Sequence, residues 1–371
     1  MTDGLRAGRA YWRVGPALAA ALSTALVAGA GCSLHSTPAV AEPDDIEMTV
    51  LFIGDAGEPD PRDPGAPLDS LYAHAAAAPG RTVILFLGDN IYPDGIPDPA
   101  APDYPDAVRR LREQVRAVPH GARGIFVPGN HDWASSGPSG LYAIRRQEAL
   151  ITELAEGRDV RLLPENGCPG PVALDAGRVR LIMVDTHWWL HSYLVEDELS
   201  DCPTDVHTAT DVLRQQVRPT MPGQIVIVTG HHPLMTGGKH GGYCGITAPF
   251  NRWAGSPQDI LSSANRTMRD SLTAAFEENP PFIYAAGHDH NLQVLRGPPE
   301  ARYLVVSGAG SYSKATCSVH MRESYFSAHN RIGFIRLDIM RGGGALLSVH
   351  HFDREGNGGL AWSRWLEEPG S

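Results

Sequence analysis

Five short blocks, each a glycine followed by a metal-binding side chain, constrain this chain more than any other feature. They read Gly54-Asp55-Ala56-Gly57, Gly88-Asp89-Asn90-Ile91-Tyr92, Gly129-Asn130-His131-Asp132, Gly230-His231-His232-Pro233 and Gly287-His288-Asp289-His290. Four of the five directly follow an apolar run, and the run at 82–87 is continuous, as expected of a strand buried on both faces. Because the carboxyl ends of parallel strands meet at one edge of a sheet, the blocks predict a single site in an α/β fold. The glycines are expected to let the chain turn sharply where each strand ends.

The sequence after residue 46 is consistent with one large domain. Hydrophobic residues make up 42% of the 371 residues, which is enough for a buried core, and no internal repeat or strong linker follows residue 46. Strands are predicted at 49–53, 82–87, 124–127, 179–184, 224–228, 282–286, 292–295, 303–307, 333–339 and 346–351. Helices are predicted at 68–78, around 108–115, and at 139–155, 206–217 and 267–278. We expect one catalytic domain over 47–355 and a C-terminal tail over 356–371.

The charge balance excludes one class of partner. A formal net charge of −11 argues against a protein that follows nucleic acid or an anionic membrane by bulk electrostatics, and no nucleic-acid-binding surface is evident. This charge does not describe the site itself, where two bound cations would reverse the local field.

The N-terminal residues have the composition of a targeting segment. A positively charged start precedes an apolar run at 16–30, which is too short to span a bilayer well. Ala30-Gly31-Cys32 resembles a bacterial lipobox, and this favours a signal peptide over 1–31, a lipid on the cysteine that attaches the protein to a membrane, and a flexible tether over 32–46. The alternative is ordinary secretion with cleavage after Ala39-Val40-Ala41. Both alternatives export the protein, either to the bacterial cell envelope or to the periplasm or medium.

Cysteine usage agrees with export. Without the lipobox cysteine, four remain, which are Cys168, Cys202, Cys244 and Cys317. An even number of cysteines in an oxidising compartment predicts two disulfides, and all three possible pairings stay open. The spacing of these cysteines fits no zinc-knuckle pattern.

The donor types in the five blocks indicate which metals they could bind. Carboxylates, a phenol, an amide oxygen and imidazoles combine hard oxygen with borderline nitrogen, a mixture that suits iron, zinc or manganese better than calcium. The number of donors is enough for two ions, and a two-metal site is one way to cleave phosphate esters.

In this order, over about 48–353, the blocks resemble those of the calcineurin-like metallophosphoesterases and, within them, of the purple acid phosphatases, including the tartrate-resistant type. The wider superfamily usually has Asp-x-His in the first block, but here Gly57 replaces that histidine, and Tyr92 follows Asp89 in the second block. This paired change is typical of the purple acid branch. The resemblance implies an α/β fold of four layers, an α-β-β-α sandwich with a single catalytic domain.

The resemblance also implies a ligand set for each metal. For Fe(III) the implied ligands are Asp55, Asp89, Tyr92 and His290, and for Fe(II), Zn or Mn they are the bridging Asp89 with Asn130, His231 and His288. The family pattern Gly-His-x-Pro selects His231 over His232. His131 and His240 are then the candidates for binding the phosphate or protonating the leaving group.

The resulting hypothesis is an exported dimetal phosphatase, active in mildly acidic to neutral solution on small-molecule phosphate monoesters. A ferric ion lowers the pKa of bound water well below that of bulk water, so attack by metal-bound hydroxide is expected even in acid. A phosphodiesterase or nucleotide hydrolase on the same site is the alternative within the same class. A non-catalytic surface lipoprotein, for adhesion or metal storage, is the alternative of a different class, and the complete donor set counts against it.

Overall fold

Two seven-stranded sheets form the centre of the part of the chain that the computed structural model describes, residues 38–59, 66–191, 202, 205–244, 256–311, 315–353 and 355–368. From edge to edge, the first sheet contains β14 (Gly358–Glu367), β13 (Ala345–Phe352), β12 (Ile332–Met340), β1 (Ile46–Ile53), β2 (Thr82–Leu87), β3 (Arg123–Val127) and β4 (Asp159–Leu162). The second contains β11 (Ser324–Ala328), β9 (Leu292–Arg296), β10 (Tyr303–Ser307), β8 (Ile283–Ala286), β7 (Ile225–Thr229), β6 (Val179–Met183) and β5 (Val172–Ala176). The predicted signal peptide and Cys32 lie outside the described residues.

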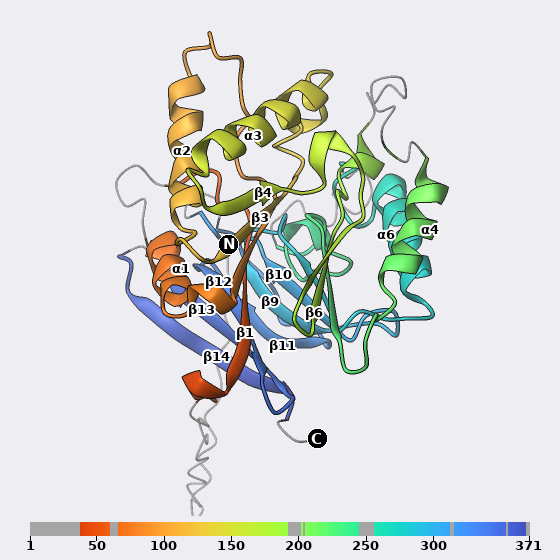
Figure 1. Cartoon of the computed structure of the whole chain (residues 1–371). Coiled ribbons are helices and arrows are strands. Elements are labelled where there is room, and N and C mark those ends of the chain that lie inside the picture. The colour runs from red at the N-terminus through yellow and green to blue at the C-terminus, as the bar shows by residue number, and fades with distance from the viewer. Residues whose placement is uncertain are drawn as a thin grey trace, which may run out of the picture. The chain divides into compact units, whose positions relative to one another are not determined.

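Helices cover the outer face of each sheet (Figure 1). The α-helices are α1 (Ala66–Ala76), α2 (Tyr104–Arg116), α3 (Gly140–Leu154), α4 (Val206–Gln216) and α6 (Ser263–Phe276). Short 3-10 turns are η1 (Pro43–Asp45), η2 (Pro79–Arg81), η3 (Ala134–Ser136), η4 (Glu165–Gly167), η5 (Trp188–Leu190) and η7 (Lys239–Gly241). No helix in the described ranges is both long and apolar enough to cross a membrane.

Three layers of apolar side chains hold this arrangement together. Phe86 and Phe126 stack at 4.0 Å beneath α1, α2 and α3, on the outer face of the first sheet. Leu85 and Ile227 lie between the sheets, and Leu272 packs α6 onto the second sheet. Full burial of such a side chain is worth about 1.5–3 kcal/mol relative to leaving it in water. The layers are those of the α-β-β-α sandwich, so the predicted fold class is confirmed.

The strand directions bring the five blocks together. In the first sheet β1, β2 and β3 are parallel neighbours, and in the second β6, β7 and β8 are parallel neighbours. Gly54 N donates to Ser307 O at 2.7 Å, which joins the end of β1 to the end of β10 in the other sheet. The carboxyl ends of both sets of strands therefore lie side by side, and the polar blocks follow them.

The predicted strands are all present, and the structure adds four that were not predicted, β4, β5, β11 and β14. These are the two edge strands of each sheet. The predicted C-terminal tail over 356–371 is corrected here, because β14 pairs with β13 along its length. The described part of the predicted tether is also held on the domain, since Arg81 donates to Pro43 O at 2.7 Å and Ser363 donates to Ala39 O at 2.7 Å.

Two disulfides are present among the described residues, as predicted. Cys168 pairs with Cys202, and Cys244 pairs with Cys317, which selects one of the three possible pairings. The second disulfide lies beside the last of the five blocks, because Asn291 Nδ2 donates to Cys317 O at 3.2 Å. It therefore links two loops that approach the carboxyl ends of the strands.

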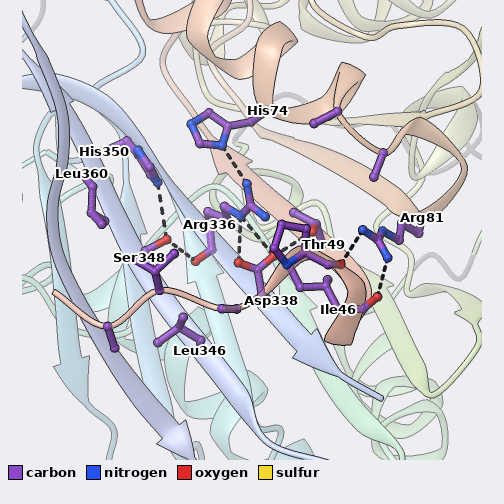
Figure 2. Close-up of a pocket in the computed structure, with 16 residues that line it drawn as sticks. Ile46, Thr49, His74, Arg81, Arg336, Asp338, Leu346, Ser348, His350 and Leu360 are labelled. Carbon is purple, nitrogen blue, oxygen red and sulfur yellow. Dashed lines mark hydrogen bonds and ion pairs between the residues drawn. The ribbon is translucent and has the colours of Figure 1, made fainter. Parts of the chain in front are cut away.

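A polar cluster interrupts the apolar outer face of the first sheet beneath the end of α1. Figure 2 shows Arg336 between Asp338 and His74, donating to the first at 2.8 Å and to the second at 2.7 Å. His74 packs edge-on against His350, with the ring centroids 4.4 Å apart, and these residues line a cavity of about 280 Å³. Burial, with His74 and Arg336 nearby, lowers the pKa of His350 to about 3.

Replacing His350 with leucine should flatten the loss of stability on acidification. In the unfolded chain a histidine takes up a proton near pH 6.5, whereas the buried His350 stays neutral down to about pH 3. The stability that this residue contributes is therefore present above about pH 6.5, and up to about 1.4 kcal/mol is lost for each pH unit below it.

Urea unfolding at about pH 7 and about pH 5 measures this difference. His207→Gln, on the exposed start of α4, is the matched control and should keep the wild-type dependence on pH. Parallel losses of unfolding free energy in His350→Leu and wild type would contradict the prediction.

Candidate metal centre

The glycines of the five blocks allow loops to approach one another closely. A Cβ added to Gly129 would lie 2.4 Å from Asp89 Oδ1, and one added to Gly287 would lie 2.6 Å from Asp55 Oδ2. Of the glycines that precede a donor, only Gly88 has a left-handed backbone, with φ of +86°. The predicted sharp turn is therefore correct for Gly88, whereas Gly129 and Gly287 are required because a Cβ would collide with the aspartates of neighbouring blocks.

The left-handed turns fall instead on donor residues. Asp55, Asp89 and His288 have φ values of 57°, 53° and 66°. A non-glycine residue in this region costs about 1–3 kcal/mol and persists only where its surroundings hold it. Three such residues at one place indicate that the fold gives up stability to aim these side chains.

The first donor cluster gathers Asp55, Asp89, Tyr92 and His290. The Tyr92 hydroxyl lies 2.9 Å from Asp55 Oδ1, 3.0 Å from Asp89 Oδ2 and 3.3 Å from His290 Nε2. His290 Nε2 lies 3.2 Å from Asp55 Oδ1. Burial, followed by the charges of Asp55 and Asp89, raises the pKa of Tyr92 well above its ordinary value. The phenol therefore loses its proton only if a strong cation replaces it.

The second cluster gathers Asn130, His231 and His288. Asn130 Oδ1 lies 3.1 Å from His231 Nε2 and 3.1 Å from His288 Nδ1, and these two nitrogens are 3.2 Å apart. Asp89 Oδ1 lies 3.4 Å from His231 Nε2, while its other oxygen belongs to the first cluster. Asp89 thus joins the two clusters, with one carboxylate oxygen at each.

The donor set fits two metal ions. The lone pairs of carboxylate, phenol, amide and imidazole groups converge on two small volumes. Most of these atoms are hydrogen-bond acceptors, so hydrogen bonds among them can satisfy only some of them. Burial lowers the pKa of His231, but the charge of Asp89 outweighs burial and raises this pKa to about 9. A cation at the second cluster would compete with that proton, so binding would release it.

Main-chain carbonyls select the ring nitrogens that face the site. His231 Nδ1 lies 2.8 Å from Leu87 O, and His288 Nε2 lies 3.2 Å from Gln258 O. Each of these nitrogens must carry the hydrogen that the carbonyl accepts, so the other nitrogen keeps a lone pair for a metal.

His232 also lies close to the second cluster, and one nitrogen from each of His231, His232 and His288 falls within 4.8 Å. Both nitrogens of His232 are engaged elsewhere. Its Nδ1 contacts Thr186 Oγ1 at 2.9 Å, and its Nε2 contacts Gln258 Oε1 at 2.6 Å. This favours His231 as the ligand, as the Gly-His-x-Pro pattern implied.

One of the two candidate catalytic histidines lies beside each cluster. His131 packs its ring against Tyr92 with centroids 4.4 Å apart, and its Nε2 lies 4.0 Å from Asp89 Oδ2. His240 lies 4.0 Å from the His288 ring, beside the second cluster. Their side chains are 29% and 21% exposed, so both can meet a molecule that arrives from solvent.

Other residues shape the site without being proposed donors. Asp132 accepts hydrogen bonds from the backbone of Asn90, Ile91 and Gly129 and so fastens the second block to the third. Gln258 and Asp259, which touch three of the histidines, belong to no block. Their contribution depends on loop conformation, and only the structure reveals it.

Gly57 stands where the wider superfamily usually has a histidine, and the structure leaves no room for one. A Cβ at this position would lie 2.4 Å from the carbonyl carbon of Asn90 and 2.5 Å from the nitrogen of Ile91. The glycine also donates to Asp89 O at 3.1 Å, so the first and second blocks are in direct backbone contact.

Gly57→Ala should therefore separate the two blocks and weaken metal binding. The added methyl has to displace backbone, and such overpacking costs about 1–3 kcal/mol or more of unfolding free energy. Metal content after dialysis and the melting temperature measure both effects. Gly342→Ala, where a Cβ meets nothing within 4 Å, should change neither. Normal metal content in Gly57→Ala would show that the close contact is not required.

The two-sheet sandwich and its joined donor clusters define a metallophosphoesterase, an enzyme that hydrolyses phosphate esters with a dinuclear metal centre. A family model described as calcineurin-like phosphoesterase matches residues 48–292. The chain belongs to this family.

One sequence relative supports the purple acid phosphatase-like branch of the family, and two solved structures share the fold. "Purple acid phosphatase 7" of Arabidopsis thaliana is 24% identical over 287 residues, which cover 73% of each protein. A Plasmodium structure described as "GAP50 the anchor in the inner membrane complex" has a TM-score of 0.55 at 17% identity and covers 86% of this chain and 88% of its own. The purple acid phosphatase PPD1 of yellow lupin (Lupinus luteus) has a TM-score of 0.54 at 14% identity, covering 86% of this chain and 53% of the lupin chain. At these identities the two structures support the fold alone.

Proposed function

We propose that the protein is an exported phosphatase that hydrolyses phosphate monoesters at a centre of ferric iron and a second, divalent metal. The position of Asp89, with one oxygen at each donor cluster, carries the proposal. Tyr92 in the first cluster favours iron(III) there, because a buried phenol gives up its proton most readily to a highly charged ion. Similarity to the Arabidopsis purple acid phosphatase supports the same reading.

Each metal would have its own set of residues. The proposed iron ligands are Asp55, Asp89, Tyr92 and His290, and those of the second ion, Fe(II), Zn or Mn, are Asp89, Asn130, His231 and His288. When bound, the ions supply positive charge for the phosphate oxygens and lower the pKa of coordinated water.

The protein's own residues orient the substrate and move a proton. His131 and His240 flank the clusters, so each is placed to hold a phosphate oxygen or to protonate the leaving group. As the bond from phosphorus to the leaving oxygen breaks, phosphorus forms a bond to an oxygen from water, and this water releases one proton to solvent. The leaving oxygen takes a proton from an imidazole, which regains one from solvent. No covalent phosphoenzyme is required.

The targeting segment would place this chemistry outside the cytoplasm. Two disulfides among the described residues support an oxidising compartment. We propose a signal peptide over 1–31 and a lipid on Cys32, with cleavage after Ala41 as the alternative. Incorporation of labelled palmitate that Cys32→Ser abolishes would support the lipid, and a mature N-terminus at Glu42 would support the alternative.

A panel of substrates with metal analysis tests the proposed reaction. The purified protein should contain iron and hydrolyse p-nitrophenyl phosphate with a kcat/KM at least about tenfold above that for bis(p-nitrophenyl) phosphate, a difference of about 1.4 kcal/mol in transition-state stabilisation. A preference for the diester would instead support the phosphodiesterase alternative. A protein that binds two metals and hydrolyses neither substrate would favour the non-catalytic one.

A further inference from the structure

The segment 256–262, between the described loop that carries His240 and helix α6, touches the histidines of the second donor cluster. It is fastened to the first turns of α6. Ser262 caps the helix by accepting from Asn265 N at 3.1 Å, and Arg269 donates to Ile260 O at 2.8 Å. Asn265 Nδ2 also donates to Gln258 O at 3.2 Å. These hydrogen bonds hold the segment in a defined conformation against α6.

Within this segment, Asp259 is paired with His240. Asp259 Oδ1 lies 2.7 Å from His240 Nδ1, and its other oxygen accepts from Ser256 N at 2.9 Å. Ile260 N donates to His240 O at 3.1 Å, so the backbone of the segment holds the same histidine. The carboxylate is 14% exposed and the imidazole 21%, which leaves the pair only partly screened by water.

The pairing fixes which nitrogen of His240 is available. A carboxylate only accepts hydrogen bonds, so Nδ1 must carry the shared hydrogen and Nε2 is the nitrogen left for another partner. The ring is also confined from the side, because it lies 4.0 Å from the ring of His288 at an angle of 33°. The neighbouring Gln258 fixes His288 in turn, through its main-chain carbonyl.

We propose that Asp259 is a positioning residue for the phosphatase reaction: it holds the His240 ring against the second donor cluster and directs Nε2, which donates its hydrogen when the ring is an imidazolium, at the substrate phosphate. This inference rests on the proposed function, because it assigns His240 a partner in that reaction. Asp259 itself does not touch substrate or metal. Outer partners of this kind typically contribute about 10- to 100-fold to activity.

Three substitutions separate positioning from general damage. Asp259→Ala should lower kcat/KM for p-nitrophenyl phosphate by about 10- to 100-fold while metal content and melting temperature stay near the wild-type values. Asp259→Asn keeps the shape of the side chain but offers one oxygen to two donors, His240 Nδ1 and Ser256 N, so it should recover only part of the loss. Asp270→Asn, on the exposed face of α6, is the matched control and should behave like wild type.

The hydrogen position on His240 provides a readout that does not require turnover. Nitrogen NMR of histidine-labelled protein, with the signal assigned through His240→Gln, should find Nδ1–H in wild type and a mixture of tautomers in Asp259→Ala. Unchanged kcat/KM in Asp259→Ala, or loss of activity only in parallel with loss of metal, would overturn the proposal. If the wild-type protein cleaves no phosphate ester, the proposed function fails. The NMR comparison would still show whether Asp259 determines which nitrogen of His240 carries the hydrogen.

Discussion

Replacing Asp89 with asparagine should remove bound metal and phosphoesterase activity together. The substitution keeps the shape of the side chain, and its oxygen can still accept the 2.9 Å hydrogen bond from His131 N. It removes the one negative charge that lies at both donor clusters. We expect a loss of kcat/KM greater than the roughly 10- to 100-fold cost of losing an outer-shell partner, because this residue would contact both ions.

Metal content by mass spectrometry of the dialysed protein, measured beside turnover, checks this result. Asp69→Asn removes the same charge from an exposed position on α1 and should leave both quantities unchanged. Near-ultraviolet circular dichroism establishes that the variant keeps its fold. Full turnover with a complete complement of metal in Asp89→Asn would exclude the bridging role.

The strands that could be predicted from sequence are those in the interior of the sheets. The continuous apolar runs of β2 and β7 reflect burial on both faces, and this burial leaves a pattern that can be read directly. The four strands missed, β4, β5, β11 and β14, have one neighbour each and are at least partly exposed along half or more of their length. Solvent on one side permits polar residues, so their sequences resemble loops.

In the candidate site, too, some residues could be predicted from the sequence and others could not. The blocks that contain its donors could be located because each follows a strand whose end has a fixed place in an α/β fold. The assignment of seven donors to two metals came from the family resemblance, and the structure brings these seven side chains together. The residues that orient the donors could not be predicted. The carbonyl of Gln258 belongs to the main chain, which any residue supplies, and Asp259 meets His240 only through the course of two loops.

Substituting Tyr92 with phenylalanine should abolish the colour of the iron-loaded protein. Tyr92 is 3% exposed, and its hydroxyl lies within 3.3 Å of three other donors of the first cluster. Its pKa is raised well above the ordinary value by burial and by Asp55 and Asp89, so a phenolate at this position requires a strong cation beside it. Ferric iron bound to a phenolate absorbs visible light by charge transfer, and neither zinc nor manganese(II) gives this band. The wild-type protein should therefore show the band, and Tyr92→Phe should lose it.

The comparison with Tyr303→Phe makes this result specific. The Tyr303 hydroxyl donates to Leu366 O at 3.0 Å, but this residue lies on β10 and belongs to neither cluster. That variant loses a comparable hydrogen bond and should keep the full band. If Tyr92→Phe retains both iron and colour, another residue supplies the charge transfer. A colourless wild-type protein that is fully active with only zinc or manganese would refute iron at the first cluster. The proposed two-metal site around Asp89 would stand even then, because it depends on the shared carboxylate and not on the identity of the ion.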